Sequence, residues 1–457
     1  FLDLRSSAGS SKVTIVYVSL LKRLTMAKIM IRLGDEHNAL IEARRGMAKA
    51  QRFDLTQLAL EFAILLRGFC YKSGDLLGYE KYDTIVKDLR LRYNAELETA
   101  EALERFGIHY KRRISYKSGT REILKQSLTI VENILQRTES HPIWMTYYKL
   151  KIYDHDMNGE YNAVYDIADK AINYLDSTSA AARANYGTFY LQQMGSCIYT
   201  RNRDKGIAAY LKAVEYIQSG NANWFTLKEF AFIFFMHINE IAKAEEIYLE
   251  ATTNKAFPQL DQIQKQRWNI LKLYELFAKD ELKRSVSKRT KEGKELRSLI
   301  TSAGDLQQDK EGFGFDVRLM HILYLVECGE YSKLTEHIDS FKKYCIRYFT
   351  PEQYPKSRAF ASLLILLERY SYNADLILKK SVERYNNLIS TKISFIEASE
   401  NVQVVPYEIL WEKIVSKLHS DTDKVRKFNE RKQRKVMATA PRLKRAAAVT
   451  DFSRTAA

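Results

Sequence analysis

Proline and glycine are scarce in this chain, which holds 6 Pro and 18 Gly among its 457 residues. Both residues are rarer than usual, since proline normally makes up about 5% and glycine about 7% of a protein. A sheet protein of this length would need many tight turns, which these two residues favour. Apolar residues recur instead at helical spacing, as Leu58, Phe62, Leu65 and Leu66 do, which is typical of amphipathic helices. The sequence therefore predicts an all-α protein.

Cysteine and long apolar runs are also lacking. The four cysteines lie far apart and form no CxxC pair, a pattern that fits buried thiols in a reducing compartment better than a disulfide framework or a zinc site. The longest apolar run near the N-terminus, Val13–Leu21, ends at Lys22 and is too short to span a bilayer. No signal-peptide pattern surrounds it. We therefore expect a cytoplasmic protein with no membrane span.

Motifs of enzyme and cofactor chemistry are absent from the sequence. It holds no phosphate-binding glycine loop, no dinucleotide fingerprint and no serine nucleophile elbow, and its 8 histidines form no close ligand pair. Asp154–Gly159 copies the first half of a calcium loop, but Tyr165 stands where that loop needs a bidentate Glu. We interpret this segment as a polar turn between helices. No metal, no cofactor and no enzymatic activity are expected.

Short breaks separate the predicted helices, as in antiparallel helical hairpins. They lie at Gly34-Asp35, Ser73-Gly74-Asp75, Ser118-Gly119-Thr120, Ser140-His141-Pro142, Asn158-Gly159 and Cys328-Gly329. The second helix of several hairpins carries small or apolar residues at a spacing of four and then three. This frame fits Gly34, Ala39, Ala43 and Gly46, then Gly159, Val164, Ala168 and Ala171, and later Ala213, Ala244, Ala251, Phe341 and Ser381. Because such side chains face neighbouring helices at close approach, Ala168 and Ala244 should be buried.

Equivalent positions of this frame recur 42 residues apart from Ala171 to Ala213, and 38 from there to Ala251. The pattern resembles the tetratricopeptide-repeat (TPR) family, with units longer than the consensus of about 34 residues. The resemblance covers roughly residues 30–390, and the chain is similar to uncharacterised bacterial TPR-like proteins. It implies a right-handed α-α superhelix, or solenoid, of about nine TPR-like hairpins over residues 13–390. It also implies protein binding in general.

The end of the chain differs from the repeats in composition. Residues 391–420 are assigned to a closing helix that caps the solenoid, with Leu418 as its last packed residue. Residues 421–457 hold eleven Lys or Arg and four Asp or Glu and have no continuous apolar face, so we expect a basic, flexible tail that adds little to folding. Lys283–Arg297 is a second basic run, with seven cations and two acids. Together the two segments account for +12 of the net charge of +16.

Two readings of function follow from this organisation. In the first, the protein is a scaffold that binds a peptide or helix in the concave groove formed by the first helix of each pair. Counting from the repeat frame places Lys149, Tyr153 and Asp156 on that face in one unit, and Glu229, Ile233 and His237 in another. Lys265 and Asn269 have the spacing of one pair of the family's carboxylate clamp. In the second reading, a regulatory or nucleic-acid-associated protein contacts nucleic acid or another polyanion through its basic tail.

Overall fold

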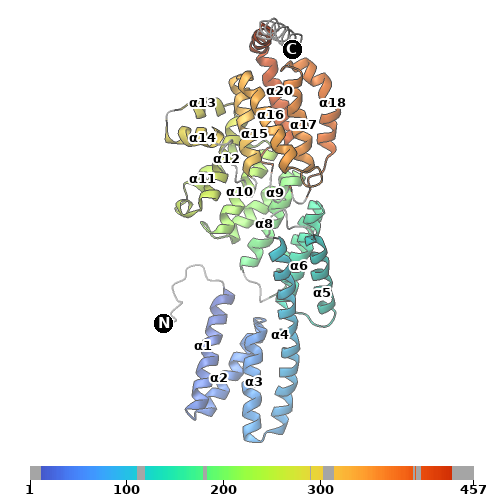
Figure 1. The fold of residues 1–457 in the computed structure, drawn as a ribbon. Coiled ribbons are helices and arrows are strands. Elements are labelled where there is room, and N and C mark those ends of the chain that lie inside the picture. Colours follow the sequence, from blue (N-terminus) through green and yellow to red (C-terminus); the bar gives the residue numbers. More distant parts are fainter. Residues whose placement is uncertain are drawn as a thin grey trace, which may run out of the picture. The chain divides into compact units, whose positions relative to one another are not determined.

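The structure is a computed structural model, which describes residues 12–110, 119–178, 183–288, 290–301, 313–394, 397 and 403–434. Every regular element in these ranges is a helix (Figure 1), which confirms the predicted all-α class. None of the described helices is both long and apolar enough to cross a bilayer. The chain divides into two units, Phe1–Phe234 and Phe235–Ala457, each with its own set of packed helices.

Unit 1 is built from helices that each pack on the next one along the chain. They are α1 (Lys12–Arg32), α2 (Glu36–Arg52), α3 (Thr56–Ser73), α4 (Leu76–Tyr110), α5 (Thr120–Leu135), α6 (His141–Met157), α7 (Tyr161–Asp176), α8 (Arg183–Thr200) and α9 (Arg203–Tyr216). Helix α10 (Ala222–His237) runs across the division between the units. This sequential packing is what an array of helical hairpins requires.

The predicted breaks and small-residue frame are confirmed in unit 1. Gly34 and Gly159 take positive φ angles of 83° and 70° between consecutive helices, a conformation that glycine adopts without strain. Ala168 is fully buried, and Ala244 in unit 2 is likewise fully buried. At Gly46 a Cβ atom would overlap the ring of Phe62. Small residues therefore stand where helices approach one another most closely.

Helix α4 departs from the regular hairpin pattern, because it is 35 residues long. Its first half packs against α3, and the helix also packs against α5 and α6. A single long helix thus takes part in two successive helix pairs. Its C-terminal turns, which include Phe106 and Tyr110, lie against α6. This placement brings the end of α4 to the site described below.

Unit 2 again consists of helices that pack in chain order. They are α11 (Ile241–Thr252), the 3-10 helix η2 (Phe257–Gln259), α12 (Gln262–Ala278), α13 (Leu282–Ser287), α14 (Lys291–Thr301), α15 (Phe313–Cys328), α16 (Tyr331–Tyr348), α17 (Pro355–Arg369), α18 (Ala374–Ser390) and α20 (Tyr407–Ser420). Helix α20 lies in the second half of residues 391–420, the segment predicted as the closing helix, and packs on α15 and α18. Its buried face includes Trp411, Ile414 and Leu418.

Residues 422–434 form a further helix, in a segment that the sequence assigned to the flexible tail. Val425 is only 5% exposed, and the ring centroid of Phe428 lies 6.0 Å from Tyr331 and 5.8 Å from Tyr372. Asn429 donates a hydrogen bond to the backbone oxygen of Ser371 over 2.9 Å. The expectation of an unpacked tail is therefore wrong for this stretch, because three residues at helical spacing contact unit 2. Residues 435–457 lie outside the described residues.

Candidate functional site

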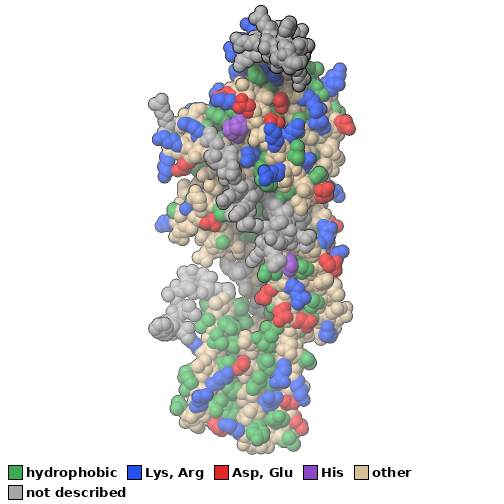
Figure 2. All heavy atoms as spheres, viewed as in Figure 1, with side chains coloured by type: hydrophobic (Ala, Val, Ile, Leu, Met, Phe, Trp, Pro, Cys, Tyr) green, Lys and Arg blue, Asp and Glu red, His purple; other side chains and the backbone are tan. Residues whose placement is uncertain are grey.

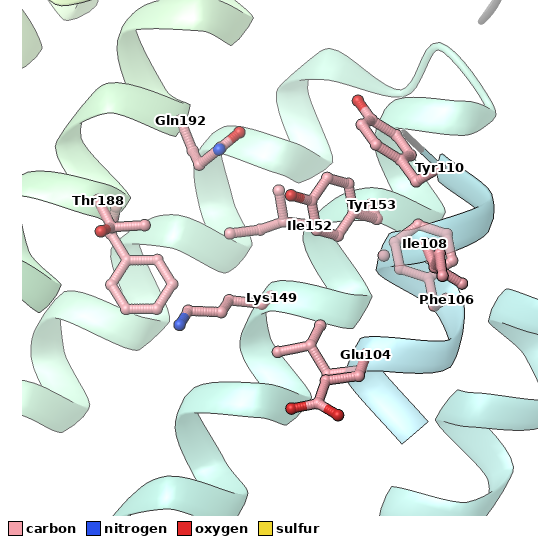
Figure 3. A pocket seen from close by; sticks show the side chains of 12 residues that line it. Glu104, Phe106, Ile108, Tyr110, Lys149, Ile152, Tyr153, Thr188 and Gln192 are labelled. Atoms are coloured by element: carbon pink, nitrogen blue, oxygen red, sulfur yellow. The ribbon is translucent and has the colours of Figure 1, made fainter. Parts of the chain in front are cut away.

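A cavity of about 560 Å³ opens in unit 1 between the end of α4, the middle of α6 and the first half of α8 (Figure 3). Its lining is mainly apolar, with a few polar side chains. It comprises Leu103, Glu104, Phe106, Gly107, Ile108 and Tyr110 from α4, Lys149, Ile152 and Tyr153 from α6, and Thr188, Phe189 and Gln192 from α8. A concave apolar site with few polar groups is typical of ligand binding.

Three aromatic rings form one side of this cavity. The ring centroids of Phe106, Tyr110 and Tyr153 lie 4.8 to 5.5 Å apart in all three pairs, a favourable spacing for tilted aromatic pairs. Burial, with a further contribution from the Asp156 carboxyl, raises the pKa of both Tyr110 and Tyr153. Both hydroxyls therefore keep their protons at neutral pH. This wall offers flat apolar surface with neutral hydroxyl groups at its edge.

Lys149 supplies the positive charge of the cavity. In Figure 3 its ammonium points away from the tyrosine rings and toward the side where Thr188 of α8 lies. The side chain is half-buried, and burial lowers the pKa of its amine. Within the described residues Lys149 has no hydrogen bond and no ion pair. The carboxylate of Glu104 lines the same cavity but forms no ion pair with Lys149 in that part of the chain.

An amine in this setting favours an anionic ligand. Removing an ammonium from water without a partner carboxylate is costly, so a ligand carboxylate at Lys149 would restore the lost interaction with water. The apolar rings beside it would bury a hydrocarbon or aromatic group of the same ligand. The arrangement therefore suits a molecule with one anionic group next to an apolar group.

The structure thus brings together two of the three residues that the sequence placed on this face of α6. Lys149 and Tyr153 are four residues apart, which puts them on one helix face, and both line the cavity. Asp156 lies one turn further along, outside the lining. Its carboxyl is half-buried, and burial raises its pKa to about 6. Among the described residues its side chain has no hydrogen-bond partner.

Replacing Asp156 by Asn should stabilise unit 1 above about pH 6 but not in acid. Because the pKa in the folded state lies above the unfolded value, the wild-type protein gains stability as the pH falls through about 6. Above that pH the charged carboxyl opposes folding, by at most about 3 kcal/mol for such a shift and by about 1–2 kcal/mol after solvent screening. Melting temperatures near pH 8 should therefore rise in Asp156→Asn, while those near pH 4 stay unchanged. A variant less stable than wild type at both values would contradict this placement.

The second predicted set, Glu229, Ile233 and His237, does not line the cavity. Ile233 is fully buried, and His237 is 6% exposed, with Nε2 donating to the backbone oxygen of Gln403 over 2.6 Å. Glu229 is half-buried. The prediction of a groove-facing row is therefore wrong for Ile233 and His237. Residues on every side of α10 are buried between Ala231 and Met236, and a helix that is apolar all round faces the core.

Two other sequence candidates have structural roles in the described part of the chain. Lys265 of the suspected clamp donates to the backbone oxygen of Pro258 over 2.8 Å. The calcium-loop likeness begins inside helix α6, and its His155 lies 2.6 Å from the Glu160 carboxylate. No group of three or more potential metal ligands occurs among the described residues.

The residues that sequence reasoning missed come from α4 and α8. Phe106, Tyr110 and Phe189 enter the site from helices distant in the sequence. The unbroken helical pattern through Leu76–Tyr110 was the available signal, because it shows that α4 is long enough to reach a second helix pair. Comparisons with protein-family models, with curated proteins and with solved structures gave no significant match to this chain.

Proposed function

We propose that this protein is an interaction scaffold that binds a segment of another protein in the cavity between α4, α6 and α8. The segment would present an aromatic or branched aliphatic side chain next to a carboxylate. In this proposal the chain is a right-handed solenoid of about nine TPR-like hairpins, and it acts by binding rather than by catalysis. The array of consecutive helix pairs supports the proposal, since such arrays present side chains of successive helices to an extended ligand.

The observation that carries this proposal is the amine of Lys149 in an apolar cavity. A lysine without a described partner destabilises the free protein, so its position is easiest to explain by a ligand group. The lining of Phe106, Tyr153 and Phe189 would hold the apolar side chain of the segment. Aromatic anchors in such pockets dominate the energetics of many protein interfaces. Lys149 would then fix the orientation of the bound segment.

Two dyes with the same ring system separate the role of charge from that of apolar burial. Anilinonaphthalene sulfonate carries one anionic group, and N-phenylnaphthylamine has the same rings without it. Lys149→Met keeps an unbranched side chain, one atom shorter, and removes its charge, so affinity for the sulfonate dye should fall about tenfold, or about 1.4 kcal/mol. Affinity for the neutral dye should not fall. Fluorescence titration measures both.

The matched control is Lys170→Met, because Lys170 is an exposed lysine on α7 outside the cavity. It should leave both titrations unchanged.

Selection from a random-peptide display library then tests protein binding itself. Peptides enriched on the wild-type protein should combine an apolar side chain with a nearby carboxylate and should be lost on Lys149→Met. Equal effects of Lys149→Met on both dyes would refute the assigned site. A library without enriched peptides would refute the scaffold and leave the cavity intact.

A further inference from the structure

A second concavity lies in unit 2 and is strongly basic. This basic groove, about 1110 Å³ in volume, is bordered on one side by α13 and on the other by α20. Its described lining holds six Lys or Arg and three Asp or Glu. The cations are Lys283, Arg284, Lys288, Lys413, Lys417 and Lys424. Figure 2 shows Lys and Arg side chains gathered beside α20 on this face of unit 2.

The groove unites the two basic segments of the sequence. Lys283 to Lys288 belong to the basic run Lys283–Arg297, and Lys424 belongs to the segment that was assigned to the tail. These two segments lie more than a hundred residues apart in the sequence, and Lys413 and Lys417 of α20 line the same groove. The packing of residues 422–434 on unit 2 keeps Lys424 at this place. Positive charge that is separate in sequence is therefore concentrated at one surface.

The three acidic residues of the described lining contact groups other than the cationic side chains of the α13 wall. Asp280 pairs with Lys413 at 3.0 Å, and a carboxylate oxygen of Glu412 accepts a hydrogen bond from the Tyr385 hydroxyl over 2.5 Å. Glu327 accepts the backbone N–H of Lys283 over 3.0 Å, and burial raises the pKa of its carboxyl. None of these contacts pairs a carboxylate with a side chain of the α13 wall, and six cations against three acids leave the described lining with a net positive charge.

The α13 wall carries the cations that are open to a ligand. Lys283, Arg284 and Lys288 are exposed, and within the described ranges their side chains form no ion pair. On the opposite wall Lys417 and Lys424 share a single carboxylate, that of Asp421, at 3.8 and 3.0 Å. Cations on both walls without matching acids attract a polyanion.

We propose that the basic groove binds the phosphodiester backbone of a single-stranded nucleic acid. Among the described lining residues Ile409 is the sole large apolar one, so they offer a peptide no anchoring surface for its side chains. A phosphate chain needs no such anchor, because release of its counterions supplies the binding free energy. Cations on two facing walls suit one strand lying between them. None of the described residues that line the groove is aromatic, so the proposed binding does not depend on base stacking and tolerates any base sequence.

The test is a salt titration of a fluorescein-labelled oligothymidylate, about 20 nucleotides long to exceed one binding site, on the full chain. Neutralising about four phosphates gives a slope near −3 for log affinity against log salt. The double variant Arg284→Glu/Lys288→Glu should weaken binding at least tenfold at low salt and reduce the slope by about half. The double variant Arg284→Gln/Lys288→Gln, which removes the two charges without reversing them, should lose less affinity. Circular dichroism of each variant checks that the fold is retained.

Two control pairs carry the same change in charge as the groove pair. Lys379→Glu/Lys380→Glu lies on an exposed face of α18, and Lys432→Glu/Arg434→Glu lies in the helix 422–434 outside the groove lining. Both should weaken binding less than threefold. If the α18 pair lost as much affinity as the groove pair, the loss would be an effect of net charge alone. If only the Lys432/Arg434 pair lost affinity, binding would lie in the segment after the groove. A polyglutamate competitor as effective as unlabelled oligothymidylate would identify an acidic protein ligand. Each of these three results would overturn the proposal.

Discussion

Ala168→Lys is expected to unfold the middle of unit 1. Ala168 is fully buried and packs in one apolar cluster with Met145 and Ile152 of α6 and Phe189 of α8. A lysine there would place an ammonium among apolar side chains that offer it no partner. The expected loss of about 4 kcal/mol or more is a large part of the total stability of a domain, about 5–15 kcal/mol. Thermal unfolding followed by circular dichroism should show an early transition.

Two matched variants separate charge from size and from position. Ala168→Met adds bulk without charge and should cost about 1–3 kcal/mol through overpacking. Asp166→Lys places the same lysine on an exposed position of α7 and should leave the transition close to that of the wild type. Hydrogen exchange, read by mass spectrometry over α6 to α8, locates the loss. If Ala168→Lys melted like Asp166→Lys, the helix contact described here would be incorrect.

Ala168 could be found from the sequence because its burial follows from a local rule. A turn glycine at Gly159, followed by small or apolar residues at five, nine and twelve positions further on, fixes both the start of α7 and the face that it buries. These constraints act within one helix and its two neighbours. The all-α class, the turn positions and the buried frame depend only on such local relations and were therefore predictable.

The cavity in unit 1 was predictable only in part. Lys149 and Tyr153 belong to one helix, so their common face follows from their spacing. The end of α4 and the first half of α8 reach the same place through tertiary packing, which no periodicity within α6 reveals. His237 shows the opposite case, because α10 is apolar on all sides and register alone could not distinguish a groove from the core.

The basic groove could not be predicted from the sequence, because its cations come from segments that lie far apart along the chain. Lys283–Arg297 and the segment from residue 421 onward were visible as separate basic runs. Since α13, α20 and residues 422–434 surround one concavity, their charges act on the same ligand. The predicted tail began at residue 421, because Val425, Phe428 and Asn429 are too few to form a continuous apolar stripe. These three residues nevertheless share one face of the helix 422–434 and pack against the rest of unit 2.

Truncation after Leu418 is expected to destabilise unit 2 strongly, contrary to the behaviour of a flexible tail. The deletion removes Asp421, which accepts the Tyr331 hydroxyl over 3.3 Å, together with the buried Val425 and the Phe428 ring. It also uncovers Tyr331 and Tyr372, which are 2% and 1% exposed in the intact chain. Re-exposure of this apolar surface should cost about 4 kcal/mol. A unit of this size should then melt about 10 °C lower.

A single substitution in the full chain shows whether packing or charge is responsible. Phe428→Ala removes the contacts with Tyr331 and Tyr372 and should account for about 2 kcal/mol, less than the value for a fully buried ring. Lys427→Ala, at the neighbouring exposed position, should leave the melting temperature unchanged. Unaltered melting of both the truncated chain and Phe428→Ala would mean that residues 422–434 add nothing to folding. In that case Lys424 would also lose its fixed place beside α20, and the basic groove would have to bind phosphate through α13 and α20 alone.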